Sequence, residues 1–187
     1  MEPKFAKKLD ARSLRGLAHP LRMRILSILR GSGPATGAHL AKQLGEDSGN
    51  ISWHLRQLAE YGFISEDETL GTKRERWWRA EHKYTELDVS EFVTDPESQI
   101  SLRTFLAEAA GQQYERASGF LREEWSVEWR STAAFSNWRL RLTPAELEAV
   151  QVQVREILDR REGSDGEGTE EVLIQLQAFP HRFAPEA

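Results

Sequence analysis

Apolar residues in the first part of the chain recur at three- and four-residue spacings, which predicts a series of short amphipathic helices. The pattern places them at about residues 20–30, 36–44 and 48–61, after a helical pattern that begins near Ser13. Pro20 suits the first turn of its helix, because proline lacks an N–H that a first turn leaves unpaired in any case. The chain is therefore expected to open with a cluster of helices joined by tight turns.

Two short strands are predicted after these helices. Residues 63–66 and 73–79 form the arms of an expected β-hairpin around Gly71, and the returning arm is rich in arginine and tryptophan. Residues 84–94 are expected to be a connector. Helices followed by such a hairpin define a winged helix-turn-helix domain, which we expect to span residues 1–86.

The second half, residues 87–187, predicts a long helix over about 96–129 and then a strand, a helix and a strand. Residues 138–142 and 172–177 alternate as strands do, and Thr143-Pro144-Ala145-Glu146 is a capping box that starts the helix between them. The expected fold class is mainly α with small β content (α+β). The C-terminal half is expected to serve dimerisation, with a candidate effector site.

The helix predicted over 48–61 has two unlike faces. Ile51, Leu55 and Leu58 fall on the inward side at 100° per residue. The opposite face is polar and aromatic, and its members are Ser48, Gly49, Asn50, Ser52, Trp53, Arg56 and Gln57. A helix that only packs against its neighbours has no reason to expose its largest residue, so this face is a candidate binding surface.

Formal charge is divided unevenly along the chain. Residues 1–86 hold 15 Lys and Arg against 11 Asp and Glu, a net charge of +4. Residues 87–187 hold 10 against 19, a net charge of −9, and the two sum to the total of −5. A basic half suits contact with a polyanion, whereas an acidic half is expected to face away from it.

Three stretches resemble ArsR-type winged-helix regulators. Residues 17–26, LAHPLRMRIL, resemble the family's opening L-x-(N/H/D)-P-x-R-x-x-I-L, and residues 51–58, ISWHLRQL, resemble its recognition helix. Residues 76–79, RWWR, resemble the end of its wing. The resemblance covers roughly residues 10–86 and implies a bacterial DNA-binding transcription regulator, usually a homodimer. The extra residues of the C-terminal half are similar to those of multidomain relatives.

Metal sensing is not implied by the resemblance. Metal-sensing members carry a cysteine pair in the helix that here begins TGAHLA at residues 36–41, and the chain contains no cysteine. The five histidines have no ligand spacing, so neither a metal nor a cofactor is expected.

Each of several residues on the exposed helix face has more than one possible role. Arg56 either contacts a guanine or phosphate or lies on a solvated face, and Asn50 and Gln57 either read adenine or are ordinary polar surface. Trp53 either presses on a thymine methyl or a sugar, or packs against the wing or a partner subunit.

Other candidates serve the DNA backbone or the C-terminal half. Ser48 and Ser52 suit phosphates or the helix cap, and Lys73, Arg74 and Arg76 suit the backbone or minor groove unless they only keep the hairpin soluble. Four aromatic residues either line an apolar pocket for an organic effector or fill a small core: Trp125, Trp129, Phe135 and Trp138.

The pattern and the resemblance together predict a sequence-specific DNA-binding regulator in the cytoplasm. The resemblance implies that it acts as a homodimer, on a pseudo-palindromic site, and in most cases as a repressor. No nucleophile, phosphate-binding or dinucleotide-binding motif is present, so no enzymatic activity is expected. No apolar run approaches the roughly 20 residues of a membrane helix. The alternative is a winged-helix module that binds protein rather than DNA.

Overall fold

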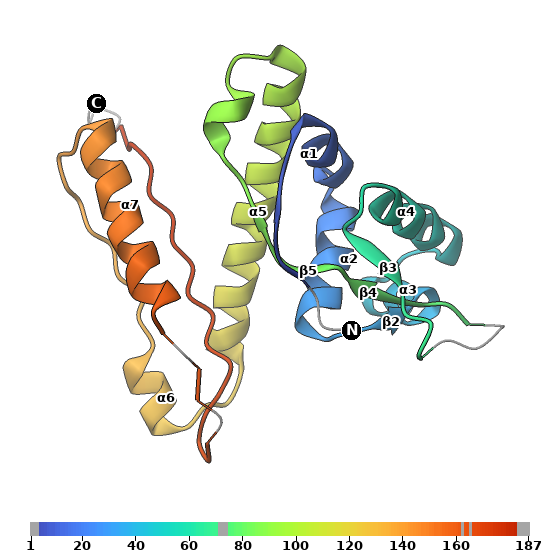
Figure 1. Ribbon diagram of the computed structural model, residues 1–187. Helices are drawn as coiled ribbons and strands as arrows, with labels where there is room; N and C mark the ends of the chain where they lie inside the picture. The colour runs from blue at the N-terminus through green and yellow to red at the C-terminus, as the bar shows by residue number, and fades with distance from the viewer. Residues whose placement is uncertain (1–3, 71–74, 162, 165, 183–187) are drawn as a thin grey trace, which may run out of the picture. The chain divides into compact units, whose positions relative to one another are not determined.

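The computed structural model describes residues 4–70, 75–161, 163–164 and 166–182. The chain divides into two compact units, Met1–Arg122 and Glu123–Ala187 (Figure 1). The boundary lies later than the sequence predicts, because helix α5 (Pro96–Arg122) packs against the first two helices of the N-terminal unit. The fold class is the expected one, mainly helical with a small β content.

The helices of the N-terminal unit confirm the periodicity analysis. They are α1 (Ala11–Leu17), α2 (Pro20–Gly31), α3 (Gly37–Leu44) and α4 (Ser48–Glu60). Local signals explain their ends: the Thr36 side chain accepts a hydrogen bond from the amide of His39, and Gly45 ends α3 with a φ of 67°.

A three-stranded antiparallel sheet follows the order β2-β4-β3. It comprises β2 (Ala35–Thr36), β3 (Ile64–Glu66) and β4 (Trp77–Ala80), with Ala35 opposite Trp78. The hairpin of β3 and β4 is the predicted wing. Its returning strand begins at Trp77 rather than at residue 73, and Lys73 and Arg74 lie outside the described residues.

A second sheet was not expected from the sequence. Strand β1 (Lys4–Lys8) runs parallel to β5 (His82–Glu86), with Ala6 opposite Tyr84. The expected connector over 84–94 therefore begins inside a strand, and a 3₁₀ turn, η1 (Val89–Phe92), follows it. Neither strand has a clear apolar alternation. The two segments are far apart in the chain, so no short turn between them predicts that they pair.

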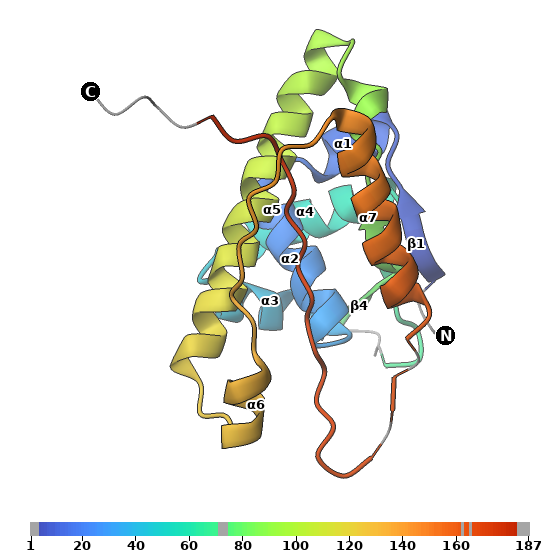
Figure 2. The same cartoon turned by 90° about the vertical axis from the view of Figure 1, so that its left-hand side faces the viewer.

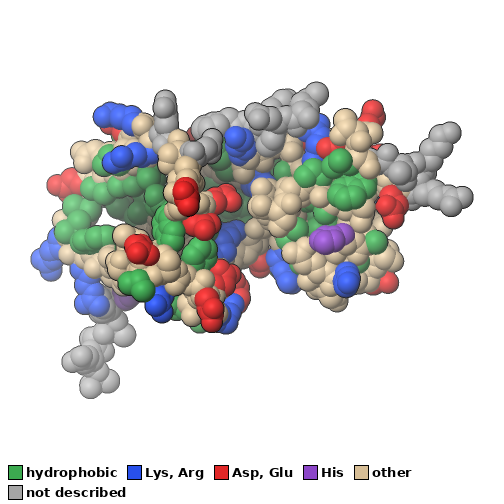
Figure 3. Space-filling view, turned by 90° about the horizontal axis from the view of Figure 1, so that it is seen from below, with side chains coloured by type: hydrophobic (Ala, Val, Ile, Leu, Met, Phe, Trp, Pro, Cys, Tyr) green, Lys and Arg blue, Asp and Glu red, His purple; other side chains and the backbone are tan. Residues whose placement is uncertain are grey.

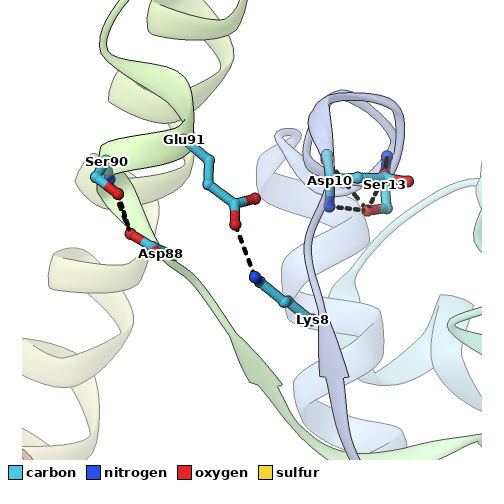
Figure 4. A network of polar contacts seen from close by, with 6 residues as sticks. All are labelled: Lys8, Asp10, Ser13, Asp88, Ser90 and Glu91. Carbon is cyan, nitrogen blue, oxygen red and sulfur yellow. Dashed lines mark hydrogen bonds and ion pairs between the residues drawn. The ribbon is translucent and has the colours of Figure 1, made fainter.

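Polar contacts hold the end of β1 beside the segment that leads to α5 (Figure 4). Lys8 Nζ lies 2.7 Å from Glu91 Oε1, and this partner raises the pKa of Lys8. Asp10 accepts hydrogen bonds from the amide and hydroxyl of Ser13, which lower the pKa of Asp10 and start α1. These contacts fix the N-terminal strand to the segment that leads into α5.

The hydrophobic core of this unit draws on every helix and on the wing. Leu14, Ile25, Leu55 and Phe63 are fully buried within it. Leu102 of α5 joins the same core, and Phe105 and Ala109 pack against its edge. Part of the apolar surface of α5 is therefore used inside its own unit.

The long helix is shorter than predicted. It ends at Arg122, and a separate helix, α6 (Val127–Thr132), follows. Ser126 has an extended backbone, and its hydroxyl accepts a hydrogen bond from the amide of Trp129, so it caps a new helix instead of continuing the old one. Trp125 lies between the two helices and does not share a helix face with Trp129.

The C-terminal unit contains the predicted helix but neither predicted strand. Helix α7 (Pro144–Asp159) starts with the expected capping box of Thr143 and Glu146. Residues 138–142 and 172–177 lie in extended segments beside α7 that form no strand in the described chain (Figure 2). The strand predictions were wrong, because alternation marks a half-buried strand only where a neighbouring backbone completes the hydrogen bonds.

No described residue of this unit is buried. Large apolar side chains remain at its surface, visible in green at the left of Figure 3. They include Phe135, Trp138, Ile157, Ile174 and Phe179. Within the described chain, no helix is long and apolar enough to cross a membrane.

Candidate nucleic-acid interface

Helix α4 is fixed at its start by Asp47 and along one side by the core. The Asp47 carboxylate accepts hydrogen bonds from the amides of Gly49 and Asn50, at 2.7 and 3.2 Å. Ile51 and Leu58 are fully buried, and α4 packs against α1, α2 and α3. The inward side is the predicted one, so the other side of the helix faces solvent.

The structure places the predicted outward residues together on that side. Six of them are exposed: Ser48, Gly49, Asn50, Ser52, Trp53 and Arg56. Gln57 is half-buried. We call this surface the α4 face.

The polar side chains of the α4 face are hydrogen bonded within the protein, which sequence reasoning did not anticipate. The donors and acceptors are Asn50 Nδ2 to Glu46 Oε2 (2.9 Å), Ser52 Oγ to the carbonyl of Ser48 (2.7 Å), Arg56 Nε to the carbonyl of Ser52 (3.3 Å) and Gln57 Nε2 to Glu60 Oε2 (3.2 Å). Because these contacts are exposed, a competing base or phosphate can replace them at small cost.

His54 of α4 is buried although its neighbour Trp53 is exposed. Only 3% of the histidine is exposed. Its ring lies 4.5 Å from the ring of His19 and 4.7 Å from that of Trp53, centroid to centroid. Burial lowers the pKa of His54 and of His19, so both imidazoles favour the neutral form.

His19 has a structural role of its own. Its Nδ1 accepts a hydrogen bond from the amide of Leu21 at 3.2 Å, so the imidazole caps α2 at the position before Pro20. Within the described chain, His54 Nδ1 and Arg22 Nε are buried without a hydrogen-bond partner. The contact between the two imidazoles therefore joins the cap of α2 to α4.

The described arginines of the wing are paired with acids. Arg76 is exposed, and its guanidinium lies 3.2 Å from Glu66 Oε1 on the opposite strand. Arg79 is similarly paired with Glu81. Trp78 is buried and Trp77 half-buried, because successive side chains of a strand point to opposite faces.

Two cations that the sequence analysis did not single out lie near the C-terminal end of α4. The Arg12 guanidinium is 5.6 Å from the centre of the Tyr61 ring, and Lys7 Nζ is 5.1 Å from that of Phe63. No local sequence signal could have placed them there, because they come from α1 and β1. Positive charge at this end complements the helix dipole.

The aromatic residues proposed for an effector pocket lie in different settings. Trp125 and Trp129 are half-buried, whereas Phe135 is 59% and Trp138 80% exposed. A cavity of about 600 Å³ lies elsewhere, between α2, α3 and α5 of the first unit. Among the described residues, no group of three or more histidines and acids is placed to hold a metal ion.

Comparison with known proteins identifies the centre of this unit. Residues 17–67, which run from the end of α1 through α4 to the wing, match a family model described as a helix-turn-helix domain. The chain therefore carries a helix-turn-helix domain, and α4 is the last helix within the matched residues. No match is found among curated proteins.

Three solved structures are similar to this chain at low sequence identity. A mutant of ZitR from Lactococcus lactis in its apo form is 15% identical, covers 76% of this chain and 82% of its own, and has a TM-score of 0.34. A mutant of MarR from E. coli is 14% identical, covers 73% and 75%, and has a TM-score of 0.32. The regulator Tm0710 from Thermotoga maritima is 10% identical, with 76% and 77% covered and a TM-score of 0.32.

Proposed function

We propose that this protein is a sequence-specific, double-stranded-DNA-binding transcriptional regulator of the ArsR type. The observation that carries the proposal is the α4 face, an exposed set of donors, acceptors and one large ring on the last helix of the matched helix-turn-helix domain. The major groove, about 12 Å wide, admits one such helix. Arg56 on this face suits a guanine edge, and the wing residues Lys73, Arg74 and Arg76 suit the backbone.

The proposal includes a homodimer formed along α5. Ile100, Ala107, Tyr114 and Leu121 stand seven residues apart and are exposed, Tyr114 by 71% and Leu121 by 69%. A heptad row of this kind follows one side of a helix and is typical of a helix that pairs with another helix. Ala110 and Ala117 lie beside the row, where small residues permit close approach.

Two subunits would place their α4 helices in successive major grooves, about 34–36 Å apart on a pseudo-palindromic site. Repression is the regulatory outcome we propose, on the resemblance to ArsR-type regulators, and the site of action is the cytoplasm. The C-terminal half, with its net charge of −9, is proposed to face away from DNA and to receive a small organic effector or a protein.

Selection of bound duplexes from a random pool tests this function directly. We expect an enriched pseudo-palindrome with half-sites one helical turn apart. Binding should weaken steeply between low and moderate salt, because each phosphate neutralised contributes nearly one unit to the salt slope. A pool that shows no enrichment would contradict the proposal.

A protein-binding role is the second candidate, favoured by the exposed ring of Trp53 and by the acids Glu46 and Glu60 at the edges of the α4 face. Under this alternative, the random pool yields no consensus and any residual DNA binding is unaffected by Arg56→Ala. The same selection therefore separates the two candidates.

A further inference from the structure

The exposed part of α4 offers one large apolar group to a partner. Trp53 is 48% exposed, whereas the other large apolar residues of the helix, Ile51, Leu55 and Leu58, are buried in the core. Nearby, the Ser52 hydroxyl and Nε of Arg56 donate hydrogen bonds to carbonyl oxygens of the helix. Trp53 therefore presents an apolar surface in the middle of an otherwise polar face.

The indole of Trp53 is in contact with a buried side chain. The His54 imidazole meets the Trp53 indole edge to face at 4.7 Å and is itself buried against His19. This contact with a buried ring restricts the rotamers open to the indole. The ring is thus preorganised for an external contact, and ordering it costs little on binding.

We propose that Trp53 is a specificity-determining residue that packs on the C5-methyl group of one thymine in each half-site. This inference rests on the DNA-binding function proposed above. The major-groove edges of the bases are hydrogen-bond donors and acceptors except for one apolar group, which is the thymine methyl. An indole flanked on the helix surface by Arg56 and Gln57 would pack on that methyl while the polar neighbours contact adjacent base edges or phosphates.

Replacement of thymine by uracil in the selected duplex tests the contact, because the two bases differ only in this methyl group. Each thymine is replaced in turn, and binding of the full-length protein is measured by titration. We expect about a fourfold loss at one thymine per half-site, the size for one buried methyl group, and little change at the others. Trp53→Ala should remove this difference between thymine and uracil, whereas Trp53→Phe should retain part of it.

Arg56→Ala is the matched control, since it lies on the same face but should leave the thymine-to-uracil ratio intact while lowering overall affinity. Thermal unfolding of each variant confirms that the exposed substitutions preserve the fold. A flat uracil scan of a protein that still selects a consensus sequence overturns this inference alone. The same holds if Trp53→Ala keeps the wild-type scan. Absence of any selected sequence instead overturns the DNA-binding function and this inference with it.

Discussion

At the scale of single residues, the buried pair of imidazoles links α4 to the start of α2. His54 and His19 lie in contact, and Arg22, Glu46 and Glu108 are the charged groups that act on them. Burial lowers the pKa of both histidines. The folded protein therefore binds protons at these residues less readily than the unfolded chain, whose histidines titrate near pH 6.5.

Stability should therefore fall as the pH drops from about 6.5 toward the lowered pKa of the folded state, and should be level above that range. His54→Gln should make the fall shallower between pH 6.5 and 5, because one of the two neutral imidazoles is gone. Urea unfolding across this range measures the effect. His39→Gln, an exposed change on α3, is the control. Equal slopes for His54→Gln and the wild type would contradict the role given to burial.

Arginines on helix and wing should differ in what they contribute to binding. Arg56→Ala should lower the preference for the selected duplex over random DNA by about 1–3 kcal/mol, since it removes a contact to a base edge. Arg76→Ala should weaken binding to both duplexes alike and reduce the salt slope by about one unit. Competition titrations at several salt concentrations distinguish these outcomes, and identical profiles for the two variants would contradict the assignment.

The α4 face shows which features of the candidate site could be predicted from the sequence. Its outward positions follow from helical periodicity, so exposure at Trp53 and Arg56 was predictable. The contact between His19 and His54 and the placement of Arg12 beside Tyr61 were not, because they depend on how separate helices cross.

At the scale of elements, α1 and α4 approach each other closely at Gly16. A β-carbon at that position would lie 2.3 Å from Cγ of Tyr61, so only glycine fits without displacement of the ring. The tyrosine ring in turn receives Arg12 on its face. The packing at this point helps to fix the direction of α4.

Gly16→Ala should destabilise the protein by about 1–3 kcal/mol through overpacking, despite the better helix propensity of alanine. Gly31→Ala, where nothing lies within 4 Å of the added carbon, should be neutral or slightly stabilising. If the clash is the cause, Tyr61→Ala combined with Gly16→Ala should cost less than the sum of the two changes. Strict additivity in chemical denaturation would contradict this explanation.

Elements with strong local signals were predictable, and those that depend on a distant partner were not. Proline at the first turn, a capping Thr36 and a capping box at Thr143 each marked a helix that the structure contains. The pairing of β1 with β5 had no local mark, and the alternation over 138–142 and 172–177 led to strands that do not form. The helix beyond Arg122 was extended too far because the cap at Ser126 was overlooked.

At the scale of the whole molecule, the two units differ in how they are held together. The first has a continuous buried core, whereas the described part of the second buries no residue. Hydrophobic burial is the main source of folding free energy, so the second unit should open at lower denaturant concentration. Hydrogen exchange should show early labelling of α7 and late labelling of α2. Equal protection of the two helices would contradict this order.

The exposed row of α5 residues spaced seven apart, which includes Tyr114, allows the proposed homodimer to be tested. Tyr114→Glu introduces a charge in the middle of the row and should convert the proposed dimer into monomers in sedimentation experiments, because two carboxylates would be buried where the two copies of α5 pair. Glu115→Gln changes one charge at the neighbouring position, off the row, and should leave the mass unchanged. A Tyr114→Glu protein that remains dimeric would exclude pairing along this row.

The parallel pairing of β1 with β5 has a consequence for motion. Residues 82–86 connect the wing to the segment that enters α5, which is where a flexible joint would otherwise lie. Backbone hydrogen bonds to the N-terminal strand and the Lys8–Glu91 ion pair immobilise that joint. Helices α4 and α5 should consequently move as a single rigid body. In the proposed dimer, any change in the angle between the two copies of α5 would then alter the separation of the two α4 helices.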